Sequence, residues 1–119
     1  MVNGAHVIIY SKDAGADRKF FRDILKLPAM DIGQAWLIFE LQPTELAIHP
    51  SDVNNKHELY FMCEDVYMLM SELKKHSIKC DEIRELSWGK LIEVELPGGG
   101  KIGGYQPLHP RINPGGSSV

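Results

Sequence analysis

The chain has little that would tie it to a membrane, to nucleic acid or to a disulfide framework. No apolar run approaches the ~18 residues that a membrane span needs, and the first residues lack the basic-then-apolar pattern of a signal peptide. Thirteen basic residues against sixteen acidic ones give a net charge of −3, so nucleic acid is not an expected partner. The two cysteines, Cys63 and Cys80, form no CxxC pair, which argues against a disulfide framework and a thiolate zinc site. We therefore expect a cytoplasmic protein that binds neither membranes nor nucleic acid.

Familiar catalytic motifs are also missing. No Gly-x-Ser-x-Gly nucleophile elbow is present. Residues 98–100 are three glycines, but no Lys-Ser/Thr pair follows them, and they stand between two expected strands, so they predict a hairpin turn and not a phosphate loop. Cys80 has no basic or histidine neighbour in sequence that would activate it. The sequence therefore assigns no catalytic residue.

The sequence does contain several segments typical of strands and two segments whose apolar residues recur at helical spacing. A composition of 44 % apolar and 24 % charged residues over 119 positions is that of one globular domain with a core. Asp13 and Asp65 stand where helix N-caps belong, each followed by apolar residues at helical spacing, and Pro28 ends the first helix. Apolar, β-branched runs predict strands at residues 5–10, 35–41, 45–49, 58–63, 80–86, 91–96 and 101–105.

The second half of the chain repeats the order of the first. His6 and Glu58 each stand seven residues before a helix N-cap, and His49 and Gly103 each stand six residues after a turn proline. The two pairs are 52 and 54 residues apart, a period that indicates stacked structural units. We expect a single domain spanning residues 1–119, with a first module at about 4–50, a linker at 51–56, a second module at about 57–107 and a loose tail at 108–119.

In this order of elements the chain resembles the vicinal oxygen chelate superfamily, which contains glyoxalase, bleomycin-resistance proteins and extradiol dioxygenases. The resemblance spans about residues 5–107 and depends on order and spacing, not on one sharp motif. It implies an α+β fold of two tandem βαβββ modules whose curved mixed sheet surrounds a cavity, the glyoxalase/bleomycin-resistance/dihydroxybiphenyl dioxygenase fold. It also implies a homodimer with the cavity at the interface. The pieces that carry it are residues 5–27, 36–50, 58–66, 88–89 and 96–107.

The same resemblance implies a metal site. Members that use a metal take its ligands from the first and the last strand of each module, and those positions here hold His6, His49, Glu58 and Gly103. Two imidazoles and one carboxylate suit a divalent Zn, Fe, Ni or Mn ion and leave coordination positions for an oxygen-rich substrate. Gly103 departs from the pattern, because glyoxalase-like and extradiol enzymes carry a carboxylate at the fourth position.

Two functions therefore stay open. The first is a metal-dependent lyase or dioxygenase that binds the metal through His6, His49 and Glu58. The alternative is a metal-free protein that binds and sequesters a small molecule in the manner of bleomycin-resistance proteins, which Gly103 favours. In both cases Tyr60 and Tyr105 are the side chains we expect to contact the ligand.

Four other residues can be interpreted either as lining the cavity or as ordinary surface or core residues. Glu93 and Glu95 share one face of an expected strand, and one of them could supply a base if that face lines the cavity, although a solvated face also explains them. Trp36 and Trp88 could line a pocket, but we interpret them as core residues.

Overall fold

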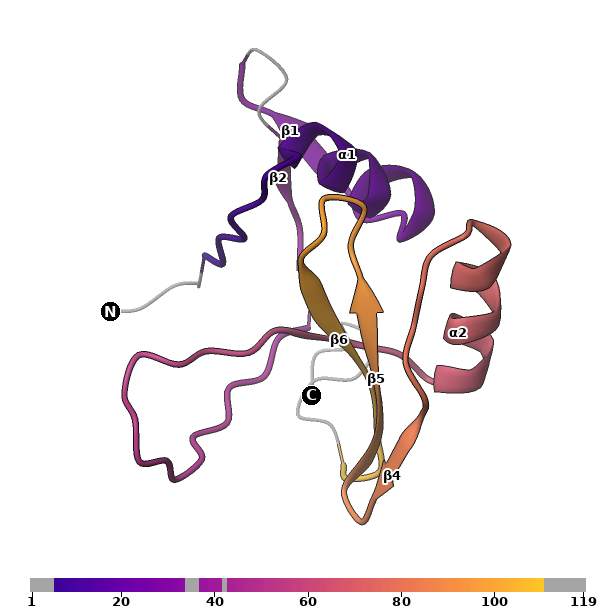
Figure 1. Cartoon of the computed structure of the whole chain (residues 1–119). Helices are drawn as coiled ribbons and strands as arrows, with labels where there is room; N and C mark the ends of the chain where they lie inside the picture. Colours follow the sequence, from indigo (N-terminus) through magenta and orange to yellow (C-terminus); the bar gives the residue numbers. More distant parts are fainter. Residues whose placement is uncertain (1–5, 34–36, 42, 111–119) are drawn as a thin grey trace.

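The computed structural model describes residues 6–33, 37–41 and 43–110, and these form a mixed assembly of helices and strands (Figure 1). The first helical segment is an α-helix that continues without a break into a π-helical turn. In chain order the elements are α1 (Ala14–Lys19), η1 (Phe20–Ile24), β1 (Ala29–Asp31), β2 (Leu37–Phe39), β3 (Tyr60–Met62), α2 (Val66–Lys75), β4 (Arg84–Leu86), β5 (Gly89–Glu95) and β6 (Lys101–Pro107).

Both helices begin at the residues expected from the sequence. Asp13 Oδ1 accepts a hydrogen bond from the Ala16 N–H at 3.1 Å. Asp65 Oδ1 accepts from the N–H groups of Tyr67 and Met68 at 2.9 and 3.2 Å. These side chains satisfy backbone donors that the first turn of a helix leaves without partners. No helix in the described ranges has the length and apolarity of a membrane span.

The second half of the chain forms a four-stranded sheet in the order β3-β6-β5-β4. β3 pairs with β6 in parallel, with Tyr60 opposite Gly103, and the other pairs are antiparallel. The three glycines of residues 98–100 form the turn between β5 and β6, as the sequence predicts, with Leu96 N–H bonded to Gly100 O at 2.8 Å. The second half therefore has the expected order of strand, helix and three strands.

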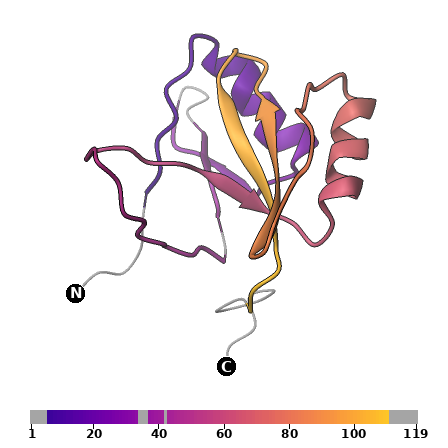
Figure 2. The same cartoon turned by 60° about the horizontal axis from the view of Figure 1, so that its bottom comes forward.

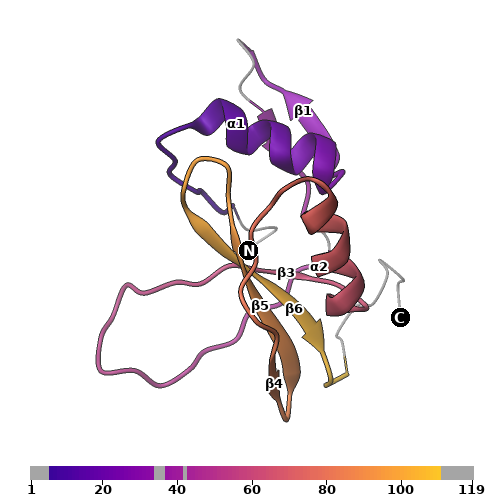
Figure 3. The same ribbon diagram turned by 45° about the vertical axis from the view of Figure 1, so that its right-hand side comes forward.

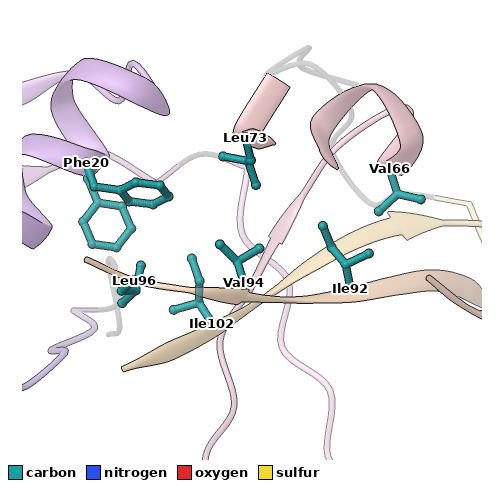
Figure 4. Close-up of a cluster of buried hydrophobic side chains, with 8 residues drawn as sticks. Phe20, Val66, Leu73, Ile92, Val94, Leu96 and Ile102 are labelled. Carbon is teal, nitrogen blue, oxygen red and sulfur yellow. The ribbon is translucent and has the colours of Figure 1, made fainter. Parts of the chain in front are cut away.

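Both helices pack on one face of this sheet (Figure 4). Phe20 from the first helical segment and Leu73 from α2 meet the side chains of β5 and β6, and each is about 1 % exposed. The apolar stripes predicted from helical spacing are thus the packing faces of the helices. The buried core consists of Phe20, Phe21, Val66, Leu73, Ile92, Val94, Leu96 and Ile102.

A buried carboxylate joins the first helix to the far end of the sheet. Asp17 is only 5 % exposed, and its Oδ1 accepts the N–H of Gly98 at 2.7 Å. Asp17 Oδ2 has no hydrogen-bond partner. A Cβ at position 98 would overlap Ser11 Oγ and crowd the Asp17 carboxylate, so the β5–β6 turn needs glycine where it meets the helix.

The first half of the chain differs from the expectation. Residues 6–10 and 45–49 have no strand partner here, although the sequence predicts strands there. A strand is stable only when its N–H and C=O groups pair with a neighbouring edge, and neither segment lies in a sheet. Residues 35–36 of the strand expected at 35–41 lie outside the described residues. β1 is an unexpected strand, because Ala29–Asp31 lacks the β-branched residues that signal one.

The unpaired segments leave apolar side chains in solvent. Tyr10 is 90 % exposed, Leu46 is 86 % exposed and Ile48 is 84 % exposed. Figures 2 and 3 show the chain between β2 and β3 running away from the body formed by the helices and the four-stranded sheet. The strands and the helix expected in the second half are therefore all present. In the first half, the helical segment is present, but the described strands are reduced to the pair β1 and β2.

Candidate ligand-binding face

The four-stranded sheet has one face turned away from the helices. Register partners share a face of a sheet, so Tyr60, Gly103 and Glu93 form one row across β3, β6 and β5. Met62 and Tyr105 begin the adjacent row, which continues with Leu91 and ends with Arg84 on β4. We call this surface the tyrosine face. It consists of Tyr60, Met62, Arg84, Leu91, Glu93, Gly103 and Tyr105.

Aromatic rings gather around Tyr105. Its ring centroid lies 6.2 Å from that of Tyr60 and 5.6 Å from that of Trp88, with interplanar angles of 68° and 66°. The ring of His109 lies 5.8 Å from it on a third side. The Tyr105 hydroxyl donates to the backbone oxygen of Trp88 at 3.4 Å. The two tyrosines that the sequence nominates for ligand contact are therefore neighbours on one surface.

Tyr60 takes the space above Gly103. A Cβ built on Gly103 would overlap Cδ1 and Cε1 of the Tyr60 ring, so the ring packs directly on the glycine backbone. The Tyr60 hydroxyl donates to Glu58 Oε2 at 3.3 Å. The missing side chain at position 103 is thus replaced by an aromatic ring from the adjacent parallel strand.

Both phenols are held in their neutral form. Burial raises the pKa of Tyr60 above its usual range, and the negative charge of Glu58 raises the pKa further, while Arg84 acts in the opposite direction. Burial, and then the charge of Glu45, raises the pKa of Tyr105. At neutral pH the two hydroxyls are therefore hydrogen-bond donors and not bases.

Glu93 lies on the tyrosine face, opposite Gly103 in the strand register. Its Oε1 lies 3.4 Å from Lys101 Nζ, and its side chain is 46 % exposed. The alternation expected from the sequence, in which Glu93 and Glu95 share a face, agrees with the register that pairs Glu95 with Lys101. Glu93 is thus a solvated, ion-paired carboxylate at the edge of the aromatic group.

The three residues expected to bind a metal are not brought together in this chain. His6 and His49 are exposed, and both lie in the segments without strand partners. Glu58 is exposed just before β3 and contacts Tyr60. Within residues 6–33, 37–41 and 43–110 no three His, Cys, Asp or Glu side chains lie close enough to hold a metal ion. The donors of a single chain in this arrangement do not fit a metal, and we derive no chemical step through one.

Sequence reasoning missed three side chains on or beside this surface. Trp88 is 43 % exposed and packs on Tyr105, whereas the sequence interpretation places it in the core. His109 belongs to the segment expected to be a loose tail, and Arg84 is one charged residue among many in the sequence. No local pattern marks these side chains, because only the strand register and the turn at residues 87–88 bring them to Tyr105. Trp36 lies outside the described residues.

A hollow of about 190 Å³ lies on the opposite side of the sheet, between the helices and β3, β5 and β6. Its lining is apolar, with Phe20, Leu69 and Ile102 among the contributing side chains. It lies within the packing between helices and sheet and lacks polar groups that would orient a ligand. The tyrosine face is therefore the better candidate for a functional site.

Comparison with known proteins identifies the fold. No protein-family model and no curated protein matches the sequence. Among solved structures, the antibiotic binding protein TnmS3 from Streptomyces sp. CB03234 superposes with a TM-score of 0.63 at 18 % identity, covering 90 % of this chain and 99 % of that one. Lactoylglutathione lyase from Agrobacterium tumefaciens gives 0.61 at 14 % identity, covering 87 % and 92 %. A glyoxalase/bleomycin resistance protein from Streptomyces sp. CB03234 gives 0.58 at 16 % identity, covering 81 % and 93 %.

The chain therefore has the α+β fold of the glyoxalase and bleomycin-resistance proteins, and the resemblance inferred from the sequence is confirmed at the level of the fold. Identities of 14–18 % are evidence for a shared architecture and for nothing finer. The structures with this fold include a binding protein and a lyase, so the fold alone does not choose between the two functions left open by the sequence.

Proposed function

We propose that this protein binds a small planar molecule on the tyrosine face, in the manner of a binding protein that holds a ligand without transforming it. The observation that carries the proposal is the aromatic group itself: Tyr60 and Trp88 each meet the Tyr105 ring edge to face, on the side of the sheet opposite the buried core of the described residues. Aromatic side chains left partly exposed beside each other are typical of sites for flat apolar ligands.

The chemistry of this surface supports binding more than catalysis. Its two hydroxyls are held neutral, since the pKa values of Tyr60 and Tyr105 are both raised. Their protons are donated to Glu58 and to the Trp88 backbone oxygen, so they offer acceptor lone pairs to a ligand, whereas a general base at neutral pH needs a pKa near 7. Glu93, the carboxylate closest in register to Gly103, is exposed and paired with Lys101. Antibiotic binding by a protein of the same fold is a relevant precedent.

Titration with bicyclic aromatic probes, followed through backbone amide NMR signals, tests the proposal. We expect the largest shifts at residues 60–62 and 103–105, and about a tenfold loss of affinity in Tyr105→Leu because a stacking partner is removed. Tyr67→Leu is the matched control, since Tyr67 lies on α2 and is 47 % exposed. The proposal fails if no probe binds at about 1 mM, or if Tyr105→Leu and Tyr67→Leu bind alike.

A divalent-metal site made by His6, His49 and Glu58 is a second proposal. It is supported by the repeat, which aligns His6 with Glu58 and His49 with Gly103. In addition, both histidines lie in segments that lack strand partners, so pairing of these segments would change their positions. Such a metal would hold an oxygen-rich ligand through its open coordination positions.

Metal analysis of the purified protein distinguishes this proposal from the first. We expect about one Zn, Fe, Ni or Mn ion per chain in the wild type, and a clear loss in His6→Ala and His49→Ala, because each supplies one of few ligands. His76→Ala on the C-terminal side of α2 is the control. Wild-type protein without stoichiometric metal, or variants that retain it, would exclude the metal site.

A further inference from the structure

The aromatic rings of the tyrosine face are arranged as walls and not as a stack. Tyr60 and Trp88 each meet Tyr105 at close to 70°, with centroids about 6 Å apart. Rings at such angles present their electron-rich faces in different directions around a shared corner. A cation placed against these faces is attracted by more than one ring at once, which is the basis of aromatic cages for ammonium groups.

Carboxylates surround this corner. Glu58 Oε2 is 3.3 Å from the Tyr60 hydroxyl, and Glu93 lies across from Gly103, on which the Tyr60 ring packs. The charge of Glu45 reaches Tyr105. The ion pairs formed by the described residues do not include Glu58, whose bonding partner is a neutral hydroxyl. Glu58 therefore places a carboxylate beside the Tyr60 ring.

The tyrosine face also carries two cationic side chains, Lys101 and Arg84. Lys101 is paired with Glu93 at 3.4 Å. Arg84 lies on β4, at the opposite edge of the sheet from β3, with Leu91 between it and Tyr105 in the row. Among the described residues, Glu93 is thus paired with a cation, whereas Glu58 on the β3 side takes part in none of the ion pairs.

We infer that the ligand of the tyrosine face is a small organic cation, whose charged nitrogen lies against the Tyr60 and Tyr105 rings beside the Glu58 carboxylate and whose planar body lies towards Trp88. This inference rests on the proposed small-molecule function and adds the charge class of the ligand. Anionic ligands are disfavoured, because Glu58 and Glu93 would repel them at short range.

Three probes with nearly the same two-ring body test the charge class: 1-methylquinolinium, which is a cation, 2-methylquinoline, which is neutral at pH 7.5, and quinoline-2-carboxylate, which is an anion. Isothermal titration calorimetry with the full chain measures each affinity. We expect the cation to bind about tenfold more tightly than the neutral probe, since cation–π and charge attraction act only on it. We expect the anion to bind most weakly.

Two variants separate charge from ring contact. Glu58→Gln keeps the size of the side chain and its hydrogen-bonding oxygen. We therefore expect it to weaken binding of the cation about fivefold and to leave the affinity for the neutral probe unchanged. Glu72→Gln, on α2 beyond the other face of the sheet, removes the same net charge and is the control.

The outcomes are distinguishable. If the neutral or anionic probe binds as tightly as the cation, or if Glu58→Gln and Glu72→Gln act alike on the cation, the charge inference is wrong while the binding function stands. If none of the three probes binds, or if Tyr105→Leu leaves all affinities unchanged, the binding function itself is wrong, and the inference is lost with it.

Discussion

The ring of Tyr60 lies where a side chain at position 103 would be. This contact decides the character of the tyrosine face, because it puts an aromatic wall at a position where the resemblance leads one to expect a carboxylate. It is also an example of a glycine required by close approach of a neighbour and not by its backbone angles. Tyr60 and Gly103 therefore act as one pair.

Gly103→Ala should lower the free energy of unfolding by about 1–3 kcal/mol, because the new methyl group overlaps the Tyr60 ring and forces it to move. Urea unfolding measures the change. Gly100→Ala is the control, since its Cβ would meet only Leu96 Cδ1 at 3.9 Å. In a Tyr60→Ala background the cost of Gly103→Ala should largely disappear. Equal costs in both backgrounds would contradict the pairing.

The phenol of Tyr60 should make stability depend on alkaline pH. Its pKa is raised above the ordinary 10.0, first by burial and then by Glu58, so the folded state holds this proton more tightly than the unfolded state. The resulting contribution is fully present below about pH 10 and is lost as the pH rises through the raised pKa. Tyr60→Phe has no proton to lose, so we expect a shallower decline of stability between about pH 9 and 11.

Denaturant unfolding at several pH values measures this decline. Tyr10→Phe is the matched control, because Tyr10 is 90 % exposed. A decline in Tyr60→Phe as steep as that of the wild type would show that Tyr60 does not contribute.

At the scale of elements, local signals in the sequence were reliable where an element is stabilised by its own residues. Asp13 and Asp65 cap the helices as expected, and the apolar stripe of α2 is its buried face. Caps and 3.6-residue periodicity act within a few residues, so they can be read without the fold. The strands at 6–10 and 45–49 show the opposite case, because strand pairing depends on a neighbour that the local sequence does not supply.

A hydrogen bond also joins the two halves of the chain. Asp17 on α1 accepts the N–H of Gly98 in the β5–β6 turn at 2.7 Å. Asp17→Ala should lower the free energy of unfolding by about 2 kcal/mol, because the hydrogen bond from the Gly98 N–H to the Asp17 carboxylate is lost. Asp17→Asn should cost less, since the amide keeps an acceptor oxygen and removes a buried charge.

Urea unfolding together with hydrogen exchange at the Gly98 amide measures both effects. Asp23→Ala is the control, because the side chain of Asp23 is 55 % exposed and pairs with Arg22 on the surface. If Asp17→Ala left Gly98 exchange unchanged, the bond would have no role in joining the helix to the turn.

At the scale of the whole molecule, the exposed apolar segments are the main feature. Val7, Ile8, Leu46 and Ile48 are each at least 50 % exposed, in two segments whose backbone lacks sheet partners. Soluble monomers seldom expose several neighbouring apolar side chains in this way. The homodimer expected from the resemblance would cover them, and it remains a prediction.

Light scattering after size exclusion tests this prediction. We expect a mass near twice the 13.4 kDa of one chain. Replacing Ile8 and Ile48 together by lysine should shift the mass towards that of one chain, because charged side chains resist burial in an interface. Met68→Lys is the control, since Met68 is 70 % exposed on α2, away from these segments. A monomeric wild type, or an equal shift in the control, would contradict the dimer.

The sequence by itself determined both helix starts and the β5–β6 turn, because caps, periodicity and turn residues are local properties. The α+β class followed from the order of elements and the resemblance that it carries, and the role of Tyr60 and Tyr105 stays a prediction. The tertiary structure decided which side chains meet. The register of β3 with β6 places Tyr60 on Gly103, and the β4–β5 turn brings Trp88 to Tyr105. It did not bring His6, His49 and Glu58 into one cluster among the described residues, and the segments of both histidines lack a strand partner. Contacts between residues far apart in sequence depend on strand pairing, and no pattern within a single segment contains that information.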